Sequence, residues 1–285
     1  MFGNTGDLGG YLLPGGEIMD DKYVDKFGVK MIYLAKIFGE EWYLDEHELL
    51  KDYRFKPDTD LTKNSDGSVK ITKDTVKMRI LTSDIVIDNE IIQDQSKAST
   101  QGYMFSPKDW LNFEATAYFK VNSDSSGQLV IYGRSGIHIE DSVLPAACAG
   151  SAYGTRIILD TGYTDITKEQ WHGQYFFTEK KIQPFLQAGI VGKWIGTKMI
   201  CYNIKQNRKD AVRIELWIDA ENNNHWKMID YVIDAGGWGN KAKECKCPAE
   251  DQIILWGGPE VVFKCVSISD VDIQKLSVRE ITLLL

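Results

Sequence analysis

The sequence predicts an all-β protein, an antiparallel sandwich or barrel, and three observations lead to this prediction. Apolar and polar residues alternate with a period of two in many short runs. Clusters of Gly, Asn, Asp and Ser separate these runs, as turns separate strands. Helical periodicity is almost absent, and only residues 45–53 (DEHELLKDY) predict a short helix.

The organisation expected along the chain is an N-terminal arm followed by one domain. Residues 1–25 predict the arm, because they include the Gly-rich stretch from Gly6 to Gly16. Residues 26–285 show no repeat, linker or low-complexity segment and predict a single domain. Its first strands are expected at 29–33, at 42–44 and, after the turn residues 63–68, at 69–71 and 76–80.

The clearest strand is predicted at 111–121. Phe113, Ala115, Ala117, Phe119 and Val121 fall on one face, and polar residues fall mainly on the other. Similar patterns predict the remaining strands at 128–132, 194–204, 211–219, 226–233, 253–256, 261–266 and 271–281.

Composition excludes several classes of protein. The 43% hydrophobic content is sufficient for a folded core, so a disordered chain is excluded. The net charge is 33 − 41 = −8, and Lys and Arg are scattered singly or in pairs, so we expect no nucleic-acid partner. No apolar stretch approaches the ~20 residues that span a bilayer, so we expect no membrane insertion. No glycine loop suited to phosphates lies between a strand and a helix, which disfavours nucleotide chemistry.

The compartment stays open at this stage. The N-terminus lacks the pattern of a secretory signal, which fits a cytosolic protein or an exported chain whose signal has been removed. The five cysteines are odd in number, and Cys245 and Cys247 lack the two-residue gap of zinc or thioredoxin-type pairs. Free or structural thiols are favoured, and the alternative is one or two disulfides that involve Cys245 or Cys247.

The C-terminal half carries a family resemblance. Gly192-Lys193-Trp194 opens one strand, a second strand contains Trp217-Ile218-Asp219, and the last strand begins at Asp270 and contains Val278. This order, over about residues 110–281, resembles the concanavalin A-like lectin/glucanase superfamily. The resemblance implies a jelly-roll sandwich whose concave sheet face binds or cleaves polysaccharides, outside the cell or at its surface.

The enzyme motifs of that superfamily are not intact here. The residues most similar to the carboxylate motif of the glucanases are Glu215, Asp219 and Glu221. Their spacing does not match that motif, and this disfavours glycoside hydrolysis. Gly136-Ile137-His138 and the stretch 185–189 only faintly resemble motifs of alginate-lyase-type enzymes.

Residues 132–172 concentrate reactive side chains, including two of the four histidines. β-Elimination on a uronate needs a group that neutralises the carboxylate, a base and an acid. Arg134 suits the first role, His138 or His172 could act as the base, and Tyr153 could act as the acid or fill both roles. An ordinary structural role in the sheet is the alternative for these side chains.

Binding without cleavage needs stacking surfaces and hydrogen-bond donors rather than an acid–base pair. The predicted binding residues are Tyr132, Arg156, Trp171, Trp238 and Trp256. A core position is the alternative for each Trp, least so for Trp238, which lies in a glycine-rich loop.

Calcium is the candidate structural ion. Members of the superfamily often hold one near the terminal strand, where Asp270 and Asp272 lie. Zinc and copper are disfavoured, because His138 and His172 are far apart in sequence and no third ligand is indicated.

Three hypotheses follow. The first is a polysaccharide-binding protein with exposed aromatic residues on a concave face. The second is a polysaccharide lyase, which requires a groove that joins Arg134, His138, Tyr153 and His172. The third is a structural or adhesive surface or virion protein, in which the N-terminal arm is a candidate for contact with a second copy.

Overall fold

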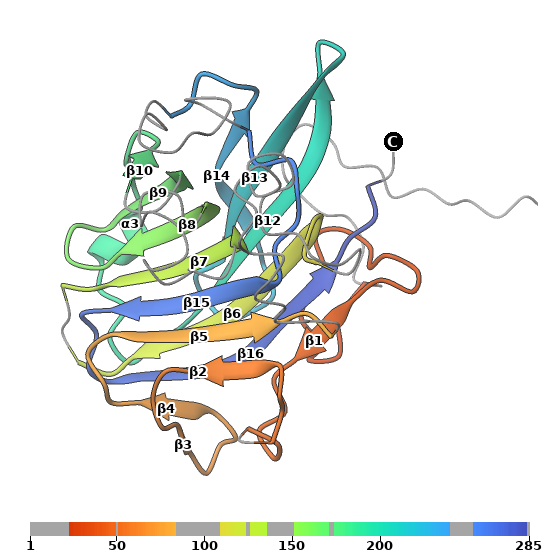
Figure 1. The fold of residues 1–285 in the computed structure, drawn as a ribbon. Helices are drawn as coiled ribbons and strands as arrows, with labels where there is room; N and C mark the ends of the chain where they lie inside the picture. Colours follow the sequence, from red (N-terminus) through yellow and green to blue (C-terminus); the bar gives the residue numbers. More distant parts are fainter. Residues whose placement is uncertain are drawn as a thin grey trace, which may run out of the picture.

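The protein is an antiparallel β-sandwich in the computed structural model, which describes residues 23–49, 51–83, 109–123, 126–135, 151–170, 174–239 and 253–283. Within these residues, two eight-stranded sheets pack face to face, and we name them the β6 sheet and the β7 sheet. The β7 sheet faces the viewer in Figure 1, and the β6 sheet lies behind it. The predicted all-β, antiparallel sandwich is therefore confirmed.

The β6 sheet has the strand order β14-β13-β12-β6-β16-β4-β3, and β1 pairs with β16. The longest strand pairing in this sheet is between β12 and β13, which form a hairpin that extends beyond the rest of the sandwich in Figure 1. The strands are β14 (Lys227–Asp234), β13 (Lys209–Asp219), β12 (Trp194–Gln206), β6 (Phe113–Val121), β16 (Val271–Glu280), β4 (Val69–Ile71), β3 (Thr62–Lys63) and β1 (Glu41–Tyr43).

The β7 sheet has the order β10-β9-β8-β7-β15-β5-β2, and β11 pairs with β9. The short helix α3 (Pro184–Gln187) follows β11. The strands are β10 (Gln174–Phe177), β9 (Tyr163–Gln170), β8 (Ala152–Ile158), β7 (Gln128–Ser135), β15 (Glu260–Val266), β5 (Val76–Leu81), β2 (Phe55–Pro57) and β11 (Lys181–Ile182).

The core lies between the two sheets and is built from alternate residues of each strand. The five apolar residues predicted to share a face of β6, from Phe113 to Val121, all belong to it. Gly133 on β7 faces the ring of Phe113, and a Cβ at this position would lie 2.0 Å from the Phe113 Cζ atom. The absence of a side chain at Gly133 therefore lets the two sheets approach.

Residues 23–35 pack against the outer face of the β6 sheet, the face opposite the core. Val29 and Ile32 join a second apolar cluster there with Tyr118, Trp217 and other residues of this sheet. The backbone N–H groups of Ile32 and Tyr33 donate to the Glu114 carboxylate at 3.1 and 3.4 Å. Most of the predicted arm, residues 1–25, lies outside the described residues, so the boundary at residue 25 stays a prediction.

Three predicted elements are wrong. Residues 29–33 form only an isolated bridge, because their N–H groups bond to Glu114 rather than to a strand. Residues 253–256 form no strand, since the Ile254 backbone bonds to the side chains of Tyr153 and Arg134. The described residues of 45–53 form turns rather than a helix, because the Asp45 and Asp52 carboxylates accept N–H groups of the nearby backbone.

The described residues contain no helix that is long and apolar enough to cross a membrane.

Candidate functional site

Arg134 lies at the end of β7 and its side chain is buried. Its backbone is in the left-handed region, with φ of 55°. The guanidinium donates to the Leu111 carbonyl at 3.0 Å, to Asn203 Oδ1 at 2.8 Å and to the Ile254 carbonyl at 2.6 Å. These bonds orient Arg134 toward three neighbouring segments and leave it no exposed surface.

Tyr153 is also buried, in a polar cluster between β8, β9 and β14. Its hydroxyl donates to Asp234 Oδ2 at 2.6 Å and accepts the Ile254 N–H at 3.0 Å. Lys168 Nζ lies 2.7 Å from the same Asp234 oxygen. Burial raises the pKa of Tyr153 well above its usual range, and the Asp234 charge raises it further, so the phenol keeps its proton.

The structure brings together three of the predicted site residues. The Trp238 ring stacks on Tyr153 with 6.1 Å between ring centroids, and Arg134 bonds to the same backbone residue, Ile254, as Tyr153. Trp256 is buried in the core, with 7% of its surface exposed. The predicted residues His138, Trp171 and His172 lie outside the described residues, so the predicted catalytic set stays a prediction.

Tyr132 and Arg156 lie elsewhere, on the outer face of the β7 sheet. Ile131 on β7 and Ile157 on β8 point into the core, so their neighbours Tyr132 and Arg156 point outward. Cross-strand pairing continues the row of Tyr132 through Gly154 and Thr167 to Phe177 on β10. Tyr132, Tyr175 and Phe177 form what we call the aromatic patch.

The two edge residues of the aromatic patch are exposed, Tyr175 at 43% and Phe177 at 46%. Their rings are near-parallel, 13° apart in orientation, with centroids 6.4 Å apart. The Tyr175 hydroxyl donates to the buried Glu169 carboxylate at 3.0 Å. The sheet edge thus presents two aligned aromatic rings, one of them anchored by a hydrogen bond.

Arg156 links the aromatic patch to the charged residues beside it. Its guanidinium lies 4.0 Å from the centre of the Phe177 ring. The same guanidinium donates to both Asp165 oxygens, at 2.7 and 2.5 Å, and to Gln128 Oε1 at 3.3 Å. A planar cation held in this way is well suited to hydrogen-bond an additional acceptor on a ligand.

Tyr132 lies in the middle of this face and is half-buried. The pKa of Tyr132 is raised to about 12, chiefly by burial and then by the charge of Glu169, while the charge of Arg156 acts to lower it. Gly154 leaves room for the Tyr132 ring, since a Cβ at Gly154 would lie 2.7 Å from Tyr132 Cδ1. The Tyr132 ring therefore lies over Gly154 on β8, where the charges of both Arg156 and Glu169 act on it.

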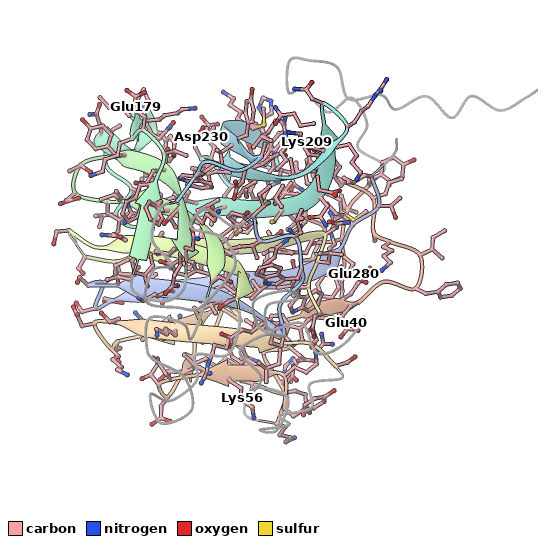
Figure 2. The ribbon with its side chains drawn as sticks, turned by 45° about the horizontal axis from the view of Figure 1, so that its top comes forward. Glu40, Lys56, Glu179, Lys209, Asp230 and Glu280 are labelled. Atoms are coloured by element: carbon pink, nitrogen blue, oxygen red, sulfur yellow. The ribbon has the colours of Figure 1, made fainter. Side chains whose placement is uncertain are left out.

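The other half of the same face carries Lys56 on β2, Lys77 and Arg79 on β5, and Lys264 on β15, which we call the basic patch. Each is the sequence neighbour of a core residue, so all four point outward. Lys56 on β2 and Glu179, which follows β10, lie at opposite edges of the molecule in Figure 2. A groove of about 740 Å³, lined by residues between Leu49 and Asp60, adjoins the Lys56 edge.

Glu260 is a buried carboxyl group beside the basic patch. Its Oε1 atom accepts the Ser135 hydroxyl at 3.4 Å, and its Oε2 atom lies 3.9 Å from the Arg79 guanidinium. Burial raises the pKa of Glu260 to about 7, although the Arg79 charge and the Ser135 hydrogen bond act to lower it. Glu260 therefore titrates close to neutral pH.

The predicted calcium ligands do not fit a calcium site. Lys70 Nζ lies 2.7 Å from Asp270 and 3.4 Å from Asp272, and Lys120 Nζ lies 2.8 Å from Asp272. Burial would raise the pKa of Asp272, but hydrogen bonds from Lys120, Asn122 and Asn64 outweigh it and lower the pKa to about 2. Two ammonium groups occupy the places where a cation would bind.

The described part of the chain holds no cluster of three or more His, Cys, Asp or Glu residues that could bind a metal ion.

Residues 23–35 cover the central part of the outer face of the β6 sheet. Glu114 is buried beneath residues 23–35 and pairs with Lys198 at 2.7 Å and with Arg279 at 2.6 Å. Lys198 also lies 4.4 Å from the centre of the Trp226 ring. Glu114, Lys198 and Arg279 therefore form ion pairs with one another inside the protein.

Sequence analysis missed Asp165, Tyr175 and Phe177 as site residues. The aromatic enrichment of the segment Gln174–Phe177 is the signal that could have identified two of them. Asp165 lies on a strand rich in buried polar residues, and its pairing with Arg156 is visible only once β8 and β9 are aligned.

No protein-family model and no curated protein sequence matches this chain. Several solved structures do match it. They include the carbohydrate-binding module CBM66 from Bacillus subtilis, with 9% identity over 80% of this chain and 96% of that chain and a TM-score of 0.41.

Two further matches have similar identities and TM-scores. Arcelin-5, a lectin-like defence protein from Phaseolus vulgaris, has 10% identity over 84% of this chain and 98% of its own, with a TM-score of 0.44. The exoplasmic/lumenal domain of VIP36, in a form bound to Ca²⁺ and Man3GlcNAc, has 11% identity over 86% and 92%, with a TM-score of 0.45. Similarity at this level carries no conclusion about what this chain binds.

Proposed function

We propose that this protein binds a polysaccharide on the outer face of the β7 sheet. The observation that carries the proposal is the aromatic patch, in which the exposed rings of Tyr175 and Phe177 adjoin the Arg156–Asp165 pair. Flat aromatic faces pack on the apolar faces of sugar rings, and charged groups beside them bond to hydroxyl or carboxylate oxygens. An extended sheet face suits an extended chain of sugars.

Binding is favoured over cleavage by the positions of the predicted catalytic residues. Arg134 and Tyr153 have no exposed side-chain surface and are already bonded to protein groups. A polysaccharide on the outer face would contact neither of them.

The proposal is tested by titrating the full chain with a panel of neutral and anionic polysaccharides in a calorimeter. The double variant Tyr175→Ala/Phe177→Ala is expected to bind at least about tenfold more weakly, a loss of about 1.4 kcal/mol. Tyr231→Ala is the matched control, because Tyr231 is 48% exposed, has Arg213 over its ring and lies on β14 of the other sheet. Unchanged affinity in the double variant, or no binding across the panel, would contradict the proposal.

The same panel separates binding from β-elimination. The sugar product of a lyase contains a new C=C bond and absorbs ultraviolet light. An absorbance increase that is lost in Tyr153→Phe and His138→Ala would establish the lyase predicted from the sequence and would replace binding as the function.

A further inference from the structure

We infer that the polysaccharide is anionic, and that its carboxylate or sulfate groups contact the basic patch formed by Lys56, Lys77, Arg79 and Lys264. This inference rests on the proposed function and adds the chemical class of the ligand. It is carried by the arrangement of the four side chains, by the few acidic groups near them and by their continuity with the aromatic patch.

The register of the strands brings the four cations together. Lys264 lies directly opposite Lys77 in the β15–β5 pair, and Lys56 lies directly opposite Arg79 in the β2–β5 pair. Like charges at directly opposed positions of an antiparallel pair destabilise a sheet. A fold that keeps two such pairs side by side therefore bears a cost that an anionic ligand would offset.

Few acidic groups compensate these charges. Within the described residues, no carboxylate forms an ion pair with the ammonium group of Lys56, Lys77 or Lys264, and Arg79 approaches Glu260 only at 3.9 Å. Asp58 and Glu169 are the carboxylates whose charges act on Lys264. Burial lowers the pKa of Lys264, and the positive charge of Lys77 lowers it further.

This patch is a local exception in an acidic protein. The net charge of the chain is −8, and some lysines elsewhere on the sheets pair closely with carboxylates, such as Lys120 with Asp272 and Lys198 with Glu114. A cluster of positive charge attracts an anion to that part of the surface, while the remaining acidic surface repels anions.

The basic patch and the aromatic patch share one continuous surface. Pairing across the sheet connects Lys56, Arg79, Val262 and Tyr132 in one row, and Lys77, Lys264, Val130 and Arg156 in the next. Seven strands at about 4.8 Å spacing span roughly 29 Å from β2 to β10. A polymer that stacks on the aromatic patch would thus extend its acidic groups over the basic patch, whereas a single small anion could not contact both.

The test uses two ligands with the same backbone and different charge. The full chain is titrated with polygalacturonate, which carries a carboxylate on every sugar, and with its fully methyl-esterified, neutral form. We expect binding to polygalacturonate that weakens with added salt, and at least about tenfold weaker binding to the ester. Dextran sulfate and dextran form a second pair and distinguish a sulfate ligand from a carboxylate ligand.

The matched variants are Lys77→Gln/Lys264→Gln and the control Lys209→Gln/Lys227→Gln, which removes two exposed lysines from the other sheet. Only the first is expected to lose affinity, by at least about tenfold, and Lys77→Arg/Lys264→Arg is expected to retain it. Cooperative thermal unfolding with a midpoint no lower than that of the wild type would confirm that each variant is folded.

The possible failures are distinguishable. If the neutral forms bind as tightly as the anionic forms and only Tyr175→Ala/Phe177→Ala weakens binding, the charge inference is overturned and the proposed function stands. If no polysaccharide binds, both fall. If duplex DNA binds instead and Lys77→Gln/Lys264→Gln abolishes it, the patch serves a nucleic acid and the inference is overturned.

Discussion

Replacement of Glu260 by glutamine is expected to change how the stability of the protein depends on pH. The folded-state pKa of about 7 lies about 2.5 units above the reference value of 4.5, because the carboxyl group is buried. A raised folded-state pKa means that the folded protein holds the proton more tightly than the unfolded chain. The stabilisation is therefore complete below about pH 4.5 and is lost as the pH rises to about 7.

The magnitude follows from the size of the shift. At about 1.36 kcal/mol per pKa unit, the full loss is about 3 kcal/mol, of which roughly 2.5 kcal/mol falls between pH 5 and pH 8. The free energy of unfolding, measured by urea titration, should therefore rise in Glu260→Gln relative to the wild type by that amount from pH 5 to pH 8. A constant offset from the new amide group cancels in this comparison.

The control for this experiment is Glu179→Gln, which replaces an exposed carboxyl group near β10. Its stability difference from the wild type should stay constant over the same pH range. If Glu260→Gln behaves in the same way, within about 0.5 kcal/mol, then Glu260 is not held in the protonated form by burial, and the reasoning about this group is refuted.

Three further outcomes are expected. Gly154→Ala should weaken polysaccharide binding and lower the free energy of unfolding by about 1–3 kcal/mol, because the new Cβ would lie 2.7 Å from Tyr132 Cδ1. Calorimetric titration measures the first effect and urea unfolding the second. Wild-type values for both would contradict the expectation. Lys198→Met should lower the free energy of unfolding by about 3 kcal/mol, since it removes one of the two cations paired with the buried Glu114. A loss under about 1 kcal/mol in urea unfolding would show that Arg279 alone is enough to stabilise the Glu114 carboxylate. Burial raises the pKa of the Cys201 thiol to about 11 and of the Cys265 thiol to about 12. In a variant in which Cys148, Cys245 and Cys247 are replaced by serine, a thiol reagent should therefore react only after denaturation. Rapid reaction of the native protein would contradict this expectation.

Most strands of the β6 sheet could be predicted from the sequence because their two faces differ in polarity. β6 and β13 each place alternate apolar residues in the core, and the period-two pattern identifies them. β8 and β9 were not predicted as strands, because their buried positions include Thr155, Asp165 and Lys168. Asp165 and Lys168 have partners on other strands, Arg156 and Asp234, so the local pattern resembles that of an exposed loop.

The candidate site was predictable only in part for a related reason. Tyr132 and Arg156 were identified as binding residues from the chemistry of their side chains, but the sequence could not show that they share a face with Phe177. Arg134 and Tyr153 have equally suitable chemistry, yet each points into the protein and bonds to Ile254. Which of two reactive residues reaches solvent depends on a bulge or a strand pairing distant in sequence.

The difference between the two outer faces supports the choice of the β7 sheet as the binding face. Glu114 and Lys198, on the outer face of the β6 sheet, pair with each other beneath residues 23–35, which also bury the neighbouring aromatic ring of Tyr118. On the β7 sheet, Lys77 and Lys264 instead face each other with like charge. Charges that a fold pairs internally stabilise that fold, whereas adjacent like charges destabilise it until a counter-charge binds. A ligand is therefore expected beside Lys77 and Lys264, which form no ion pair with the described carboxylates. These lysines lie on the face on which Tyr175 and Phe177 are exposed.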